Sequence, residues 1–118
     1  MGQVENMGIR TFKAGADLLK YRRVKLNGVD TVVYAGAGEA AIGITMDYAS
    51  SGDYIAVRTQ TQGLCLKVEA GATITGAAAL YGGADGVVSS SSSGTQIGVS
   101  LENDVTSGAI FEELLRQL

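Results

Sequence analysis

The sequence predicts an all-β protein that folds as one small domain, either a β-barrel or a β-sandwich of short strands. Its 118 residues suit a single domain with one core. Small residues dominate the composition, which includes 17 glycines and no proline, and this favours short strands and tight turns over long packed helices. Short runs in which apolar and polar residues alternate lie between glycine turns, as expected of half-buried strands.

The first residues differ from the rest of the chain because they show no clear period. We expect residues 1–11 to form an extended N-terminal arm and residues 12–118 to form the β domain. The arm carries three apolar side chains, Val4, Met7 and Ile9. These side chains either pack on a partner or belong to a disordered tail, and the sequence does not choose between the two.

A β-hairpin is predicted around Asn27-Gly28. Val24 and Leu26 alternate with charged neighbours before this pair, and a β-branched run begins at Val29 after it. An Asn-Gly pair between two such runs is a strong hairpin signal, because both turn residues must accept a positive φ. Asp85-Gly86 is a second pair of the same type.

Further strands are expected on both sides of the middle of the chain. Residues 54–59 and 64–69 alternate between apolar and polar side chains, and Cys65 is expected to be a small apolar filler on a strand face. The serine run 89–93 predicts a polar loop. The tail 111–118 is either a helix or a strand: the spacing of its large apolar residues favours one or two helical turns, whereas a strand would carry large apolar groups on both faces.

The sequence contains one internal echo. Residues 42–47 match residues 97–102 at a constant offset of 55, and each segment is followed by a Ser-Gly turn and another apolar run. Gly43 and Gly98 occupy the same place in the two segments, and a glycine inside an apolar strand suggests a bulge or bend. We interpret the echo as two related corners of one barrel.

Charge is unevenly distributed along the chain. Residues 1–25 carry six basic and two acidic side chains, whereas the rest carries three basic and ten acidic ones. The acidic body argues against nucleic-acid binding, and no run of about 18 apolar residues suggests a membrane span. The basic group either docks on an acidic protein surface or is a solvated strand edge; its candidate contact residues are Arg10, Lys13, Arg22 and Arg23.

The usual residues of catalytic and cofactor chemistry are missing. The chain has no histidine and one cysteine, so it lacks the common ligands of zinc and haem and cannot form an internal disulfide. Residues 36–41 fit the relaxed dinucleotide pattern GxGxxA, but β-branched residues follow where a helix would have to begin. A flexible loop is therefore the better interpretation, and we expect neither an enzyme nor a cofactor.

Several short motifs together resemble a family of small decoration (cement) proteins of tailed-phage heads. The motifs cover about residues 12–111, and their order and spacing carry the resemblance more than any one of them does. They are Phe12-x-Ala14-x-x-Asp17-Leu18, Val24-x-Leu26 before a glycine turn, Ile42-Gly43-Ile44, Ala70-Gly71-Ala72 with Ile74, Leu80-Tyr81 with Asp85-Gly86, and residues 97–102.

This resemblance implies a structural virion protein made in the bacterial host cytoplasm. It would bind the outer surface of an assembled head and cement neighbouring copies of the major capsid protein, similar in role to the lambda-type decoration proteins. A homotrimer is implied, although some cement proteins are dimers. Family members usually end in a strand, from which the helical pattern of the tail here departs.

A small β-sandwich binding module is the alternative function. Such a module on a phage tail or bacterial surface would bind a glycan or a protein ligand and would need exposed aromatic rings in a cleft. The available rings are Phe12, Tyr21, Tyr34, Tyr48, Tyr54, Tyr81 and Phe111.

Overall fold

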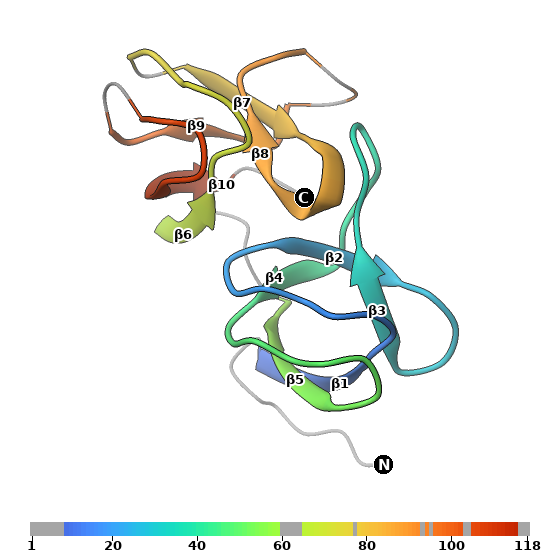
Figure 1. The fold of residues 1–118 in the computed structure, drawn as a ribbon. Coiled ribbons are helices and arrows are strands. Elements are labelled where there is room, and N and C mark those ends of the chain that lie inside the picture. Colours follow the sequence, from blue (N-terminus) through green and yellow to red (C-terminus); the bar gives the residue numbers. More distant parts are fainter. Residues whose placement is uncertain are drawn as a thin grey trace.

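A computed structural model describes residues 9–59, 65–76, 78–92, 94, 96–102 and 105–115, with side chains to residue 113. Within these ranges the chain forms ten strands and one short 3₁₀ helix, so the predicted all-β class is confirmed. The strands form two units of five that follow one another along the chain (Figure 1).

The first unit is a closed barrel. Its strand order is β1-β3-β2-β4-β5, and β1 closes the barrel by pairing antiparallel with β5 and parallel with β3. The strands are β1 (Ile9–Ala14), β2 (Arg23–Leu26), β3 (Thr31–Tyr34), β4 (Gly43–Thr45) and β5 (Tyr54–Arg58).

Alternate residues of these strands fill the barrel interior. Phe12 and Ala14 of β1 are buried, and Phe12 lies opposite Ile55 of β5. Val24 and Val32 complete the same apolar cluster with no exposed surface. This period of two is what places one side of each strand in the core.

The second unit has the same strand arrangement. Its order is β6-β10-β9-β7-β8, and a parallel bridge between Ala70 and Val88 links its two ends. The elements are β6 (Cys65–Glu69), β7 (Ala79–Gly82), η1 (Ala84–Gly86), β8 (Val88–Ser89), β9 (Gly98–Ser100) and β10 (Ile110–Leu115). We call the two units the first and the second barrel.

The two barrels are copies of one pattern. β6, β7 and β10 each begin 56 residues after β1, β2 and β5, and β9 begins 55 residues after β4. Isolated bridges repeat as well, since Leu18–Ala49 in the first barrel corresponds to Ile74–Val105 in the second. The internal echo therefore marks equivalent strands of two barrels, and its interpretation as two corners of one barrel was wrong.

Both predicted hairpins are present. β2 and β3 pair across a turn at residues 27–30, in which Gly28 has a φ of 97°. Val29 lies in this turn with 89% of its surface exposed, so the following strand begins at Thr31 instead. Asp85-Gly86 lies in η1 between the antiparallel strands β7 and β8.

The C-terminal tail and the arm differ from the prediction. Residues 110–115 form strand β10, not a helix, because β10 pairs with both β6 and β9, and such tertiary pairing overrides local helix propensity. Ile9, Arg10 and Thr11 were assigned to the arm but belong to β1. Val4 and Met7 lie outside the described residues.

Gly43 is required by the close approach of β4 and β5. A Cβ atom at this position would overlap the carbonyl group of Arg58, and Ile44 is the register partner of Arg58. Gly98 is likewise central in its sheet, with Leu80 of β7 on one side and Leu115 of β10 on the other.

Candidate functional site at the junction of the two barrels

Arg22 joins the two barrels through its guanidinium group. Nε and Nη2 donate to the two carboxylate oxygens of Glu69 in β6, at 3.1 and 2.9 Å, and Nη1 donates to the carbonyl of Asp85 at 2.9 Å. The guanidinium also lies 5.3 Å from the ring centre of Tyr34. Only 11% of the Arg22 side chain and 21% of the Glu69 side chain are exposed. This bidentate ion pair therefore stabilises the fold more than a solvent-exposed ion pair would.

Arg23 is buried at the same junction. Only 1% of its surface is exposed, and Nη2 donates to the carbonyl of Glu39 at 2.5 Å. Its guanidinium lies against Gly82 of β7, where a Cβ atom would overlap it. Burial lowers the pKa of Arg23 from its ordinary value, and the nearby acidic groups Glu113 and Glu39 act in the opposite direction.

Glu113 of β10 is the acidic group buried near Arg23. It has no exposed surface, and neither of its carboxylate oxygens has a hydrogen-bond partner within the described ranges; the same holds for Nε and Nη1 of Arg23. Burial raises the pKa of Glu113 to about 8, although the charge of Arg23 acts to lower it. Arg23 and Glu113 therefore interact through space without a direct hydrogen bond.

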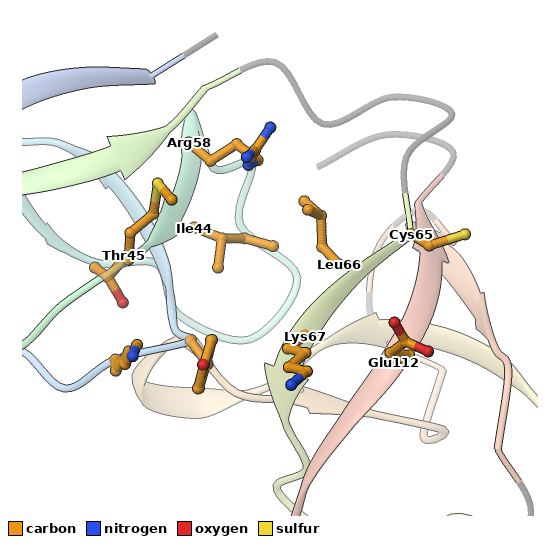
Figure 2. A pocket seen from close by; sticks show the side chains of 10 residues that line it. Ile44, Thr45, Arg58, Cys65, Leu66, Lys67 and Glu112 are labelled. Atoms are coloured by element: carbon orange, nitrogen blue, oxygen red, sulfur yellow. The ribbon is translucent and has the colours of Figure 1, made fainter. Parts of the chain in front are cut away.

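A cleft of about 390 Å³ lies on another side of the junction. Figure 2 shows Ile44 of β4 and Leu66 of β6 between Arg58 and Lys67. The apolar contact continues inward, because Ile44 packs with the core cluster of the second barrel. The ten lining residues are Lys20, Tyr21, Ile44, Thr45, Met46, Arg58, Cys65, Leu66, Lys67 and Glu112.

The cleft is basic in a chain whose net charge is −3. Three cationic side chains line it, against one carboxylate, that of Glu112. Lys20 lies 5.0 Å from the ring centre of Tyr21. Among the described residues, the side chains of Arg58 and Lys67 have no hydrogen bond or ion pair. Glu112 is the register partner of Lys67 across the β6–β10 ladder, and the lining as a whole keeps a net positive charge.

The basic residues predicted for partner contact are separated by the fold. Arg10 and Lys13 are both exposed but lie on opposite faces of β1: Lys13 points away from the core, whereas Arg10 shares the face of Phe12, lies 4.8 Å from its ring centre and pairs with Asp30 at 2.8 Å. Arg22 and Arg23 are used inside the chain, and Arg23 is too buried to touch a partner. This corrects the expectation for Arg23, since a run of charges in a sequence does not show which of them a second barrel will cover.

Sequence reasoning missed the residues that matter at the junction. Arg58, Lys67 and Glu113 were not singled out, and Cys65 is an exposed residue at the cleft and not a strand filler. One signal was available: Ala14-Gly15-Ala16 recurs as Ala70-Gly71-Ala72, 56 residues later. Together with the echo at 42–47 and 97–102, it indicates two complete repeats with a junction between them.

The pattern GxGxxA at residues 36–41 lies in a loop, as expected. The amide of Gly36 donates to a carboxylate oxygen of Glu39 at 2.6 Å, and Nζ of Lys25 lies 2.9 and 3.0 Å from the two carboxylate oxygens. These hydrogen bonds, that from Lys25 first, hold the pKa of Glu39 below its usual range. The carboxylate of Glu39 thus accepts the hydrogen bond from Gly36 that a dinucleotide-binding loop would donate to a phosphate.

Within the part of the chain that the structure describes, no three Asp, Glu or Cys side chains gather in a way that would hold a metal ion. No helix there has the length and apolar character to cross a membrane. Tyr21 is the one aromatic residue of the cleft lining, and a glycan-binding cleft would present more ring surface.

Comparison with known proteins finds a structural likeness. No protein-family model and no curated protein matches the sequence. The fold is similar to the crystal structure of the head fiber gp8.5 N base in bacteriophage phi29, with a TM-score of 0.78. The likeness covers 93% of this chain and 96% of that chain at 20% sequence identity, and it shows that the two share a fold.

Proposed function

We propose that this protein is a structural component of a phage virion that binds the outer surface of the head. The observation that carries the proposal is the likeness to the phi29 head fiber base over nearly the whole of both chains. The sequence motifs shared with head decoration proteins point to the same place in the virion, although they come from a different comparison. Such a role requires no catalytic group and no cofactor.

The role at the head surface is to cement neighbouring major capsid subunits. A protein that binds the assembled shell and not its free subunits lowers the free energy of the assembled state by mass action. Many identical copies multiply this effect, and a trimer would engage several subunits at once. The two-barrel body supports this role, because Arg22 bonds across the junction to Glu69 and to the carbonyl of Asp85, and Arg23 lies against Gly82 of the second barrel.

The exposed side of β1 is the proposed contact surface, together with the residues that precede it. Lys13 lies on this side opposite Tyr54 of β5, and 73% of the Tyr54 surface is exposed. Aromatic side chains are enriched in interface cores, and a lysine beside them favours encounter with an acidic surface. The proposed contact residues are Ile9 and Lys13 on this side of β1, Arg10 at the start of the strand, and Val4 and Met7 before it.

Binding to phage heads that lack this protein tests the proposal. Purified protein should sediment with such heads in a fixed stoichiometry, and deleting residues 1–8 or making Lys13→Glu should weaken binding by about tenfold or more. The deletion stops at residue 8 because β1 begins at Ile9 and closes the barrel. Lys67→Glu makes the same charge change at the cleft and is the matched control.

Two outcomes would count against the proposal. Protein that fails to sediment with heads at any concentration would refute the head-surface role itself. Normal decoration by the Lys13→Glu and deletion variants would refute the contact surface but not the role. Light scattering should give the mass of a trimer, and a monomer in solution and on heads would contradict cementing through a trimer.

A further inference from the structure

The cleft at the junction has a free strand edge as one wall. In the described ranges β6 pairs with β10 on one side only. The amide of Glu69 donates away from β10, to the carbonyl of Tyr21 in the first barrel, at 3.1 Å. Because backbone groups alternate in direction along a strand, the amides and carbonyls of Lys67 and Cys65 also point away from β10, and both residues line the cleft.

The equivalent edge of β1 in the first barrel is paired with a neighbouring strand. In the first barrel, the position equivalent to Glu69 is Lys13, whose amide donates to the carbonyl of Asp30 beside β3, its parallel neighbour. In the second barrel, Tyr21 supplies that carbonyl from outside the barrel. The edge of β6 thus already bonds to the backbone of a segment outside its own sheet, and no other described residue bonds to its next two outward positions, Lys67 and Cys65.

The side chains around this edge select an acidic partner. Arg58 and Lys67 lie on opposite sides of the apolar pair Ile44 and Leu66 (Figure 2). A strand added along β6 would place alternate side chains over the apolar pair and the others beside the cations. Carboxylates at the second set of positions would pair with Arg58 and Lys67, whose charges have no partner in the described chain.

We propose that the cleft between the two barrels binds an extended acidic peptide segment of a partner protein, which adds as a strand to the free edge of β6. Main-chain hydrogen bonds to Cys65 and Lys67 would supply affinity for an extended backbone, and Arg58 with Lys67 would supply the preference for carboxylates. This site is separate from the contact surface on β1, so either can fail without the other.

Cys65 offers a direct readout in the intact protein. It is the single cysteine of the chain, it is exposed, and it lines the cleft. A trifluoromethyl group attached to its thiol gives one ¹⁹F resonance, and a short peptide in which glutamate alternates with valine serves as the probe. The acidic peptide should shift this resonance saturably, and calorimetry with unlabelled protein should give the same affinity.

Two matched peptides and a small-anion control separate the two parts of the proposal. Replacing every glutamate with lysine should abolish binding, which tests the charge preference. A proline in the middle of the acidic peptide should weaken binding about tenfold, because proline cannot donate to a ladder. Free glutamate or citrate should bind far more weakly than the peptide; equal binding would mean a site for small anions and would overturn strand addition.

Charge reversal on the protein completes the test. Arg58→Glu and Lys67→Glu should each weaken binding of the acidic peptide by about tenfold or more, while Lys13→Glu, outside the cleft lining, should leave it unchanged. Arg58→Gln and Lys67→Gln serve where the reversed variants do not fold. Acidic and basic peptides that bind native protein equally, or not at all, would overturn the proposal without any variant.

Discussion

Glu113 occupies in the second barrel the position that Val57 occupies in the first. Val57 is the register partner of Thr45 in β4, and Glu113 is the register partner of the equivalent Ser100 in β9. Both side chains are fully buried. The second barrel therefore carries a carboxyl group where its counterpart carries an apolar side chain, and Arg23 is the cation buried near it.

This substitution predicts a pH-dependent stability. The folded-state pKa of Glu113 is raised from 4.5 to about 8, so the folded protein binds this proton more tightly than the unfolded chain does. The stabilisation is complete below about pH 4.5 and is lost as the pH rises towards 8. The free energy of unfolding should fall across this window by at most about 1.4 kcal/mol per pH unit from this group.

Glu113→Gln isolates that contribution from those of other groups. Urea unfolding of both proteins between pH 5 and 8 should show that the native protein loses stability relative to the glutamine variant as the pH rises. A native protein that gains stability over the variant in this range would mean that Glu113 is ionised and held by Arg23.

Substituting Arg23 or Glu113 alone should lower the free energy of unfolding, and substituting both should lower it by less than the sum of the two single losses. Arg23→Met loses the hydrogen bond to the carbonyl of Glu39 and, above about pH 8 where Glu113 is ionised, leaves that carboxylate without a nearby cation; the expected cost there is about 3 kcal/mol. Glu113→Val restores the residue type of the first barrel but leaves Arg23 buried. In the double variant the two costs should overlap by at least about 1 kcal/mol, and simple additivity in a double-mutant cycle would show that the two groups do not interact.

Arg22→Ala should weaken the attachment of one barrel to the other. It removes two charge-assisted hydrogen bonds to Glu69 and one to the carbonyl of Asp85, and urea unfolding should show a loss of about 1–2 kcal/mol. Arg10→Ala is the control, because it breaks an ion pair to Asp30 whose side chains are both more than half exposed. Its cost should stay below about 0.5 kcal/mol, and equal losses in the two variants would contradict the bridging role.

The sequence allowed the fold class and the turns to be predicted because these depend on local chemistry. Asn27-Gly28 and Asp85-Gly86 mark hairpins in the structure. The positive φ values fall at Gly28 and Asp30 in the first turn and at Asp85 and Gly86 in the second, and few other residue types tolerate this conformation. The tail was predicted as helix because propensity was the only local guide, whereas β10 is fixed by its two neighbouring strands.

The junction could not be predicted in the same way, because it depends on how two repeats meet. The echo at Gly43 and Gly98 was visible, but a single matching segment does not distinguish two strands of one barrel from one strand in each of two. Arg22 and Arg23 are adjacent in sequence and both basic, yet one bridges to Glu69 and the other is buried near Glu113. Only the packing of the second barrel on the first gives them these different roles.

Gly43→Ala should open the first barrel at β4. Its Cβ atom would overlap the carbonyl of Arg58, a backbone atom that cannot move aside without breaking the pairing of β4 with β5, so the expected loss is about 2–3 kcal/mol. Gly52→Ala is the matched control. Its Cβ would meet no atom within 4 Å, but its φ is 92°, which limits the cost to about 1 kcal/mol of backbone strain.

Thermal and urea unfolding of the two alanine variants would compare steric overlap with backbone strain inside one barrel. A larger loss for Gly43→Ala is expected, together with faster hydrogen exchange of the amides of β4 and β5, because the β4–β5 ladder would open first. If Gly52→Ala were the more damaging change, the close approach of β4 to β5 would not be what requires glycine at this position. In that case the glycine repeated at Gly98 would need a different explanation as well.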